Sequence, residues 1–272
     1  MRTIEITIPD ELYQRLQQAA QEQGITISEL VQQILERALA EWEEDAGVET
    51  KGGGEAQMSA TQTEHQDEWL LDAPLMREFI EKVNEVRYRE PDPQKIVAEI
   101  RPYFAKLLAD QTWLPESFMA EADGESGMGG KIGMWLLYRA GDGGLAFSAL
   151  VLPPEAQTPV HDHLAWGLVG LYRGEQDEEV FGRKDSGAQA GHAELEVTER
   201  NLLKPGDFYE LLPENDIHRV RTTSDITSVS LHLLGNDNGC IWRHQFKPEA
   251  QEVAPFKSGW LNTDCREYEA TA

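Results

Sequence analysis

The feature that most limits the fold of this chain is a series of short β-like runs between residues 133 and 246. Each run is rich in branched and aromatic side chains, and Gly, Pro or Asp residues separate one run from the next. Strands this short and this frequent are typical of an antiparallel barrel or sandwich. The fold is therefore predicted to be mainly β, with strands at Gly133–Arg139, Leu145–Leu152, Gly167–Tyr172, Glu178–Phe181, Ala193–Val197, Asp207–Leu212, His218–Thr222, Thr227–Leu234 and Ile241–Phe246.

Two helical patterns precede this β region. Apolar residues recur at helical spacing within 74–87 and again within 93–109, and each set forms one apolar face. We expect two core helices that pack against the barrel, and we assign them no chemistry.

Histidines are concentrated in the β region. His161 and His163 are one residue apart on a segment that reads as a strand, so their side chains point to the same face. His218 begins a later predicted strand, which a barrel can fold back beside the pair. Two close histidines and a third from another strand suit a three-nitrogen metal site with open positions. An isolated pair at this spacing is more often structural, but five of the seven histidines lie in strand-like segments of this region, and only His65 and His192 fall in segments that read as linker or loop.

Residues 1–46 form a separate pattern. A strand at 2–8 alternates isoleucine with polar residues, a helix follows from Pro9 to Gly24, and a second helix runs from Ser28 to about Trp42. After it, residues 47–67 contain three consecutive glycines and few apolar groups, as flexible linkers do. We therefore predict a main domain at 68–262, followed by a tail at 263–272.

The strand–helix–helix pattern resembles the ribbon-helix-helix family. A single copy cannot bury its strand, so the resemblance implies a homodimer formed through a shared ribbon. In DNA-binding members the outward ribbon residues enter the major groove; here they are Thr3, Glu5 and Thr7. Glu5 would then face phosphate with few cations nearby, so we favour a dimerisation unit and keep DNA binding as an alternative.

Composition restricts the partners of the chain. The formal net charge of −25 disfavours general attraction to nucleic acid or to an anionic membrane. No run of eighteen apolar residues suggests a membrane span, and the first residues show no apolar signal region. Cys240 and Cys265 do not look like a disulfide framework, which favours a reducing, cytoplasmic location.

The region around the paired histidines resembles a known enzyme family. The residues concerned are Thr158-Pro159-Val160-His161-Asp162-His163, Trp166-Gly167-Leu168 and Arg173-Gly174-Glu175, with further likeness at Trp113-Leu114-Pro115-Glu116 and Ser258-Gly259-Trp260. They are similar to bacterial thiol dioxygenases, the cupins of the cysteine dioxygenase and 3-mercaptopropionate dioxygenase group. The resemblance covers most of the predicted main domain and implies a jelly-roll cupin barrel. Gly167 stands where the general cupin pattern has a glutamate ligand, which leaves three neutral nitrogens.

The resemblance implies a metal and a reaction. His161, His163 and His218 would bind Fe(2+), and the enzyme would convert a small thiol carboxylate and O2 into a sulfinic acid. Three neutral ligands leave the ion its full charge, which favours the thiolate form of a substrate.

The same resemblance implies roles for three more residues. Arg243 would bind the substrate carboxylate with its planar guanidinium, and Ser230 and His232 would belong to a relay beside the metal. Without the resemblance, Arg243 reads as a surface arginine on an edge strand and His232 as a core histidine.

The chain departs from the family at two points. Leu234 stands where the family relay has a tyrosine, and Tyr209 is one candidate to supply the missing hydroxyl. No cysteine lies between His163 and Gly174, so the thioether crosslink of the animal enzymes cannot form. The sequence leaves open whether cysteine or 3-mercaptopropionate is the substrate. Two alternatives also remain: a cupin regulator that senses a metal or ligand, and a cupin enzyme of another reaction type.

Overall fold

The computed structural model describes residues 30–31, 65–212 and 216–266. The chain divides into two compact units, residues 1–61 and 62–272. In the first unit only the helical residues Leu30 and Val31 are described. The remaining predictions for 1–46, including the ribbon residues, lie outside the described residues, as do most of the linker and the end of the tail.

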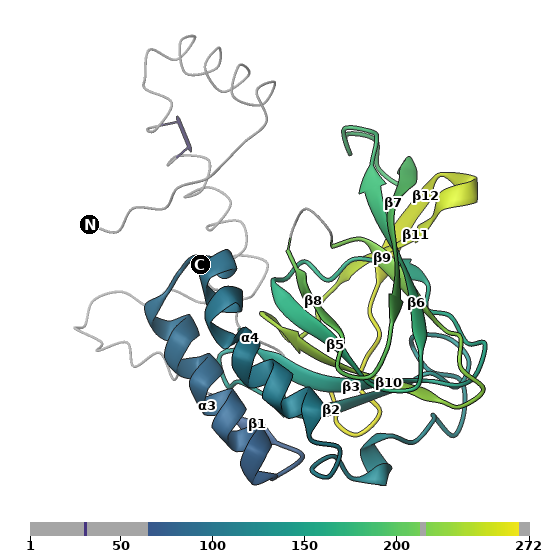
Figure 1. Cartoon of the computed structure of the whole chain (residues 1–272). Coiled ribbons are helices and arrows are strands. Elements are labelled where there is room, and N and C mark those ends of the chain that lie inside the picture. The colour runs from purple at the N-terminus through teal and green to yellow at the C-terminus, as the bar shows by residue number, and fades with distance from the viewer. Residues whose placement is uncertain (1–29, 32–64, 213–215, 267–272) are drawn as a thin grey trace, which may run out of the picture. The chain divides into compact units, whose positions relative to one another are not determined.

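The second unit is built from two antiparallel sheets (Figure 1). One sheet has the order β1-β2-β3-β10-β5-β8 and the other β12-β11-β4-β9-β6-β7. The strands are β1 Glu68–Trp69, β2 Gly133–Arg139, β3 Ala146–Leu152, β4 Val160–His161, β5 Gly167–Arg173, β6 Gln176–Arg183, β7 Leu195–Leu203, β8 Phe208–Leu211, β9 His218–Thr222, β10 Ser228–Leu234, β11 Arg243–Lys247 and β12 Glu252–Phe256. Sequence neighbours are often not sheet neighbours, so the barrel depends on contacts between distant segments.

Two helices, α3 (Pro74–Arg89) and α4 (Pro93–Ala109), lie side by side along the first sheet (Figure 1). Both start with proline, which suits the first helical turn because its missing N–H is not needed there. The side chain of Asp92 accepts a hydrogen bond from the Gln94 N–H at 3.0 Å and caps α4. Their apolar faces are buried in the main core, as predicted.

Strand β10 shows how this packing positions the site. Val229, Leu231 and Leu233 belong to the core beneath the helices. Because side chains alternate along a strand, Ser230 and His232 face the opposite way, into the space between the sheets. All seven residues of β10 are buried, so its polar face lies in the interior of the protein.

The nine predicted strands are present with shifts at their ends, the largest in β7, which runs to Leu203 instead of Val197, and two short strands were missed: β1 and β12. β4 has a consequence for the histidine pair. The segment was predicted as a strand that carries both His161 and His163, but β4 ends at His161. His163 lies beyond it, at the start of a turn.

The prediction for the cysteines was wrong. Cys240 and Cys265 form a disulfide, with their Cα atoms 5.3 Å apart. Nothing in a spacing of 25 residues indicates this bond, because it depends on how the C-terminal segment returns past the β10–β11 connection. In the described part of the chain, no helix has the length and apolar character that a membrane crossing requires.

Candidate metal centre

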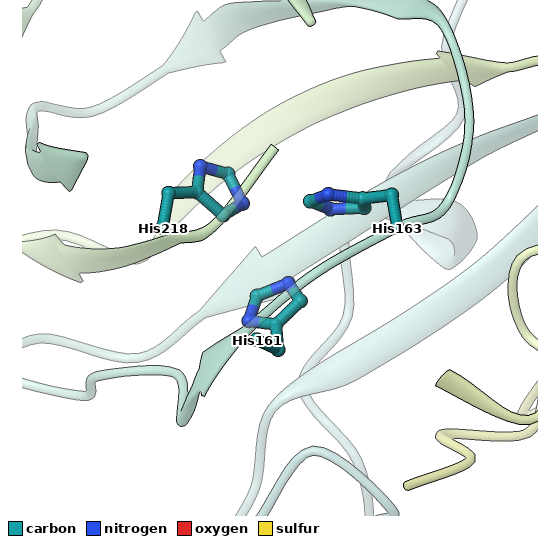
Figure 2. A group of neighbouring side chains, drawn as sticks. All are labelled: His161, His163 and His218. Carbon is teal, nitrogen blue, oxygen red and sulfur yellow. The ribbon is translucent and has the colours of Figure 1, made fainter. Parts of the chain in front are cut away.

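The three predicted metal ligands come together inside the second unit. His161 ends β4 and His218 begins β9, and the two residues are direct partners across these strands. One ring nitrogen from each of His161, His163 and His218 lies within 4.8 Å of the others, and all three residues are at most 3% exposed. Figure 2 shows the three rings facing a common centre.

The turn after β4 directs His163 toward its partners. Asp216 accepts hydrogen bonds from the backbone N–H groups of His163 and Leu164, at 2.9 and 2.8 Å. Leu164 has a φ of 53°, a left-handed conformation that a leucine adopts only when its surroundings enforce it. Asn236 donates to the His163 carbonyl oxygen at 3.0 Å from the other side. The position of His163 therefore depends on residues far from it in sequence.

Each ligand ring is also oriented through its Nδ1 atom. Nδ1 of His161 lies 2.9 Å from the Pro159 carbonyl oxygen, Nδ1 of His163 lies 3.0 Å from Asp216 Oδ1, and Nδ1 of His218 lies 2.8 Å from Glu178 Oε1. An Nδ1–H donated to these acceptors leaves the Nε2 lone pair available to a metal.

The free nitrogens fit a metal ion. Among the described residues, the buried Nε2 of His218 has no hydrogen-bond partner. A buried polar atom without a partner is costly, and a metal ion would remove that cost. Three imidazoles suit Zn, Cu, Fe or Ni, so the ligand set by itself does not select one of them.

Electrostatics favour neutral histidines at this centre. Burial holds the pKa values of His161 and His163 well below their usual range, and nearby Arg243 lowers both further. Burial acts to raise the pKa of Glu178, but its hydrogen bonds with His218, Tyr209 and Asn201 and its attraction to His218 together outweigh burial, and the pKa is lowered. The site therefore presents two neutral imidazoles, His161 and His163, and a carboxylate behind His218.

A small cavity adjoins the ligands. His161, His163, His232 and Arg243 line it together with apolar side chains, which include Met128, Leu150 and Leu234. His232 Nε2 lies 3.0 Å from Ser230 Oγ. Burial lowers the pKa of His232 to about 3, so its ring is neutral near pH 7. Its burial and its bond to Ser230 are also what a satisfied core histidine would show, so the structure leaves both interpretations of His232 open.

Arg243 is fixed in the wall of this cavity. Its Nη1 donates to the Asp162 carbonyl oxygen at 2.7 Å and its Nη2 to Ser258 Oγ at 3.2 Å. Burial lowers its pKa to about 10, so the guanidinium stays charged at neutral pH. Among the described residues, no hydrogen-bond partner contacts its buried Nε. Because Arg243 is only 2% exposed, the surface interpretation is wrong.

Tyr209 lies on the other side of the ligands. Its hydroxyl is 3.2 Å from His218 Nδ1, the atom opposite the free Nε2, and it also hydrogen-bonds Glu178. In this position it supports the Glu178–His218 pair and does not replace the hydroxyl absent at Leu234.

Sequence reasoning missed Glu178, Asp216 and Ser258. Asp216 had a local signal, because it lies two residues before His218. Glu178 had only a weak one, a carboxylate at an inward position of a predicted strand. Ser258 had none, because its contact with Arg243 depends on the path of the C-terminal segment.

Comparison with known families identifies the N-terminal segment. Residues 3–43 match the CopG-like RHH_1 or ribbon-helix-helix domain, RHH_5. The chain therefore carries an N-terminal ribbon-helix-helix domain, as the strand–helix–helix pattern predicted.

Three solved structures illustrate what the remainder resembles. A recombinant oxalate oxidase in complex with glycolate is 18% identical, with a TM-score of 0.28 over 35% of this chain and 43% of the other. A Cupin 2 conserved barrel domain protein from Salinispora arenicola is 15% identical, with a TM-score of 0.29 over 39% and 76%. The Cupin_2 domain of an XRE family transcriptional regulator from Enterobacter cloacae is 16% identical, with a TM-score of 0.27 over 38% and 94%.

These comparisons concern the fold class alone. The chain spans less than half of the oxalate oxidase chain, and all three likenesses are too distant to carry an argument about the reaction. The protein is mainly β, with two antiparallel sheets, two packing helices, cupin-like neighbours and an N-terminal ribbon-helix-helix domain. The predicted fold class is confirmed.

Proposed function

We propose that this chain is an iron(II)-dependent thiol dioxygenase that converts a small thiol carboxylate and O2 to a sulfinic acid. The observation that carries the proposal is one small cavity bordered both by neutral, buried histidines and by a buried, charged Arg243. A metal site needs the first feature, and recognition of a small anion needs the second.

His161, His163 and His218 would hold the ferrous ion, which would supply the redox chemistry with O2 and favour a thiolate. Because all three ligands are neutral, the charge of the ion is not offset within the ligand set. The nearest carboxylate supports are Glu178 and Asp216, which act through the Nδ1 atoms of His218 and His163.

Arg243 is proposed to bind the substrate carboxylate. Within the described part of the chain its Nε–H has no partner, and one contact of its Nη2 is the weak acceptor Met128 Sδ at 3.9 Å. A carboxylate would accept from these donors in a bidentate manner. The contacts with Asp162 and Ser258 hold the guanidinium in place for it.

Ser230 and His232 are proposed to handle a proton beside the substrate. His232 is neutral, so its Nε2 can exchange a hydrogen bond with Ser230 Oγ in either direction. Leu234 continues the same face of β10 and contributes an apolar surface where the family has a hydroxyl. Together with Met128 and Leu150 it would limit water in the cavity.

Oxygen consumption by the ferrous-loaded full chain tests this proposal. We expect uptake with sulfinate formation from cysteine or 3-mercaptopropionate, and none from the His163→Ala variant. Cysteamine, which lacks a carboxylate, should be a poor substrate, and mercaptosuccinate tests the room for a second carboxylate. Iron-loaded protein that consumes no oxygen with any of the four thiols would refute the proposal.

The Arg243→Lys variant tests carboxylate binding separately from iron binding. Lysine keeps the charge but loses the planar fork, so KM for the carboxylate thiols should rise while iron content stays unchanged. Arg200→Lys is the matched control, because the Arg200 side chain is 69% exposed on the outer face of β7. An unchanged KM for Arg243→Lys would remove Arg243 from the substrate site.

The N-terminal ribbon-helix-helix domain favours a second candidate function, a DNA-binding regulator whose cupin domain senses a metal or ligand. We propose instead that residues 1–46 serve homodimer formation, with a linker at 47–67 and a catalytic domain at 68–262. The net charge of −25 supports dimerisation over DNA binding. A gel shift at low salt tests the alternative, since even weak phosphate contacts should appear there. We also propose a cytoplasmic location, where the Cys240–Cys265 bond would meet a pool of small thiols.

A further inference from the structure

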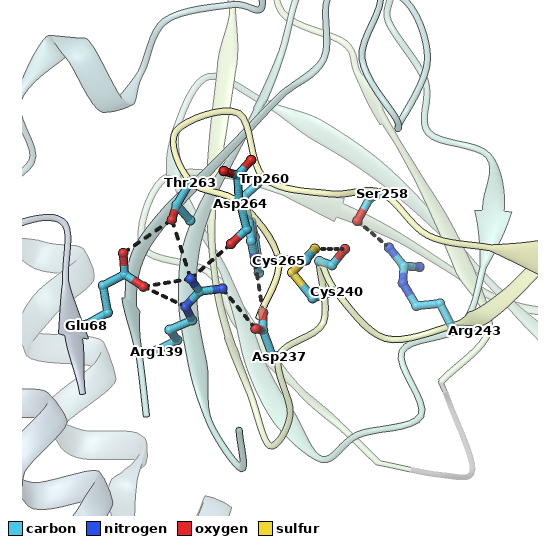
Figure 3. Close-up of a disulfide and its surroundings, with 11 residues drawn as sticks. Glu68, Arg139, Asp237, Cys240, Arg243, Ser258, Trp260, Thr263, Asp264 and Cys265 are labelled. Carbon is cyan, nitrogen blue, oxygen red and sulfur yellow. Dashed lines mark hydrogen bonds and ion pairs between the residues drawn. A yellow bond between two sulfur atoms is a disulfide. The ribbon is translucent and has the colours of Figure 1, made fainter. Parts of the chain in front are cut away.

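The Cys240–Cys265 disulfide joins two segments beside the cavity (Figure 3). The first is the β10–β11 connection, residues 235–242, and the second is the C-terminal strap, residues 257–266. The two cysteines differ in solvent exposure: Cys240 is only 8% exposed, whereas Cys265 is an exposed residue. A reagent in solution therefore meets the Cys265 side of the bond first.

The connection holds one side of the site. Asn236 and Asn238 donate to the His163 carbonyl oxygen at 3.0 and 3.4 Å. Cys240 closes a turn by donating its N–H to the Asp237 carbonyl oxygen at 2.8 Å, and Arg243 follows three residues later as the first residue of β11. Movement of the connection would therefore reach both His163 and Arg243.

The strap holds the other side of Arg243. Ser258 Oγ accepts from Arg243 Nη2, and the Ser258 carbonyl lies so close to Gly127 that a Cβ there would meet its oxygen at 1.9 Å. Met128, beside Gly127, lines the cavity and contacts Arg243. The strap is therefore packed against both elements of the Arg243 wall.

Strap and connection also contact each other directly. The Gly259 N–H donates to the Gly239 carbonyl oxygen at 2.8 Å, and Trp260 Nε1 donates to Asp237 Oδ1 at 2.8 Å. The Trp260 ring covers Gly239, where a Cβ would come within 2.3 Å of it. The disulfide links the same two segments covalently. Its reduction would therefore weaken these hydrogen bonds.

We propose that the Cys240–Cys265 disulfide is a thiol-exchange site through which small thiols loosen the strap from the connection. A thiolate attacks the sulfur of Cys265, the more exposed of the two residues, a bond forms between these two sulfurs, and the protein disulfide breaks. The electron pair leaves on the Cys240 sulfur, which takes up a proton. A second thiolate attacks the small-molecule sulfur of the mixed disulfide and releases the Cys265 thiol and a small disulfide. Two thiols are oxidised for each protein disulfide reduced.

This proposal does not rest on dioxygenase activity, because each readout can be taken without substrate turnover. The strap keeps other anchors after reduction, including the bond from Arg139 Nη2 to the Asp264 carbonyl oxygen at 3.0 Å. The expected change is therefore local loosening at the junction, with the barrel unchanged.

Exposure of the full chain to graded mixtures of reduced and oxidised glutathione tests the exchange step. After alkylation and peptide mapping, we expect a glutathione adduct on Cys265 at intermediate ratios and alkylation of both cysteines at reducing ratios. A bridge that stays closed in millimolar reduced glutathione, while the chain in denaturant is reduced, would overturn the proposal.

Hydrogen–deuterium exchange of the oxidised and reduced wild-type chains tests the structural consequence. The Gly259 and Cys240 amides should exchange at least about tenfold faster after reduction, the scale expected for loss of a bridge of this span. Amides within β10 serve as the internal reference. The Cys240→Ser/Cys265→Ser chain should resemble the reduced protein and show no response to glutathione. Equal exchange at Gly259 and Cys240 in both redox states would make the bond a purely structural link.

Discussion

The two walls of the cavity are built in different ways. The histidine wall rests on sheet register: His161 pairs with His218 across two strands, and neighbouring β6 supplies the carboxylate of Glu178. The Arg243 wall is assembled from the loop at Met128, the β10–β11 connection and the C-terminal strap. Arg243 itself begins strand β11, but the loop segments around it are held by a few hydrogen bonds and one covalent bond, whereas a sheet is held by many cooperative hydrogen bonds.

The two walls should therefore differ in how easily their residues move. The three histidine rings are oriented by contacts within the protein alone, as a catalytic metal centre would require. The wall that would recognise a substrate contains the segments best able to move. The predictions below test this division, from the largest expected effect to the smallest.

Removal of a ligand should have the largest effect. His218→Ala takes away Nε2, which has no hydrogen-bond partner among the residues that the structure describes, and we expect a loss of iron affinity greater than the ~100-fold typical of supporting residues. Metal analysis after reconstitution and desalting measures it. His192→Ala, in the loop before β7, is the control and should retain iron. Full occupancy in His218→Ala would contradict the assigned centre.

Loss of the disulfide should affect stability but not the metal. A bridge that closes 25 residues contributes about 3 kcal/mol to the free energy of unfolding, so Cys240→Ser/Cys265→Ser should be destabilised by about that amount in urea. Because His161 and His218 are held by the sheet, and Asp216 still holds the His163 turn when the connection loosens, iron affinity should stay within about twofold of wild type, far below the effect of a supporting residue. A large fall in iron affinity would show that the two walls are not separate.

The Glu178→Gln variant tests whether the hydrogen bond between Glu178 and Nδ1 of His218 strengthens iron binding by His218. The amide preserves shape but removes the charge that orients the His218 ring, so we expect about 10- to 100-fold weaker iron binding. Glu179→Gln is the matched control, because Glu179 faces outward and pairs with Arg219 and Arg200. Competition with a chelator measures both. Equal affinities for the two variants would remove Glu178 from the centre.

The smallest effect concerns pH and His232. Its pKa of about 3 in the folded protein lies below the ~6.5 of an unfolded chain. The unfolded state therefore binds more protons between these values. The contribution of His232 to stability is complete above about pH 6.5 and is lost as the pH falls toward 3.

His232→Gln should therefore reduce the slope of unfolding free energy against pH by up to ~1.4 kcal/mol per pH unit. Urea denaturation of the metal-free protein between about pH 7 and pH 5 gives this slope. Identical slopes for variant and wild type would mean that His232 is not buried as a neutral ring.

The sequence by itself determined the local elements and the candidate metal ligands. Short β-like runs separated by Gly, Pro or Asp located nine strands, helical spacing located α3 and α4, and His161, His163 and His218 were singled out by residue type and strand position. These signals are local because each depends on side chains within one element.

Only the tertiary structure decided what surrounds those ligands. Glu178 reaches His218 because β6 pairs with β9, Asp216 caps the turn at His163, and Cys265 meets Cys240 when the strap folds back. The burial that makes Arg243 a wall of the cavity also comes from three separate segments. Such contacts join residues far apart in the chain, so no local period or motif encodes them.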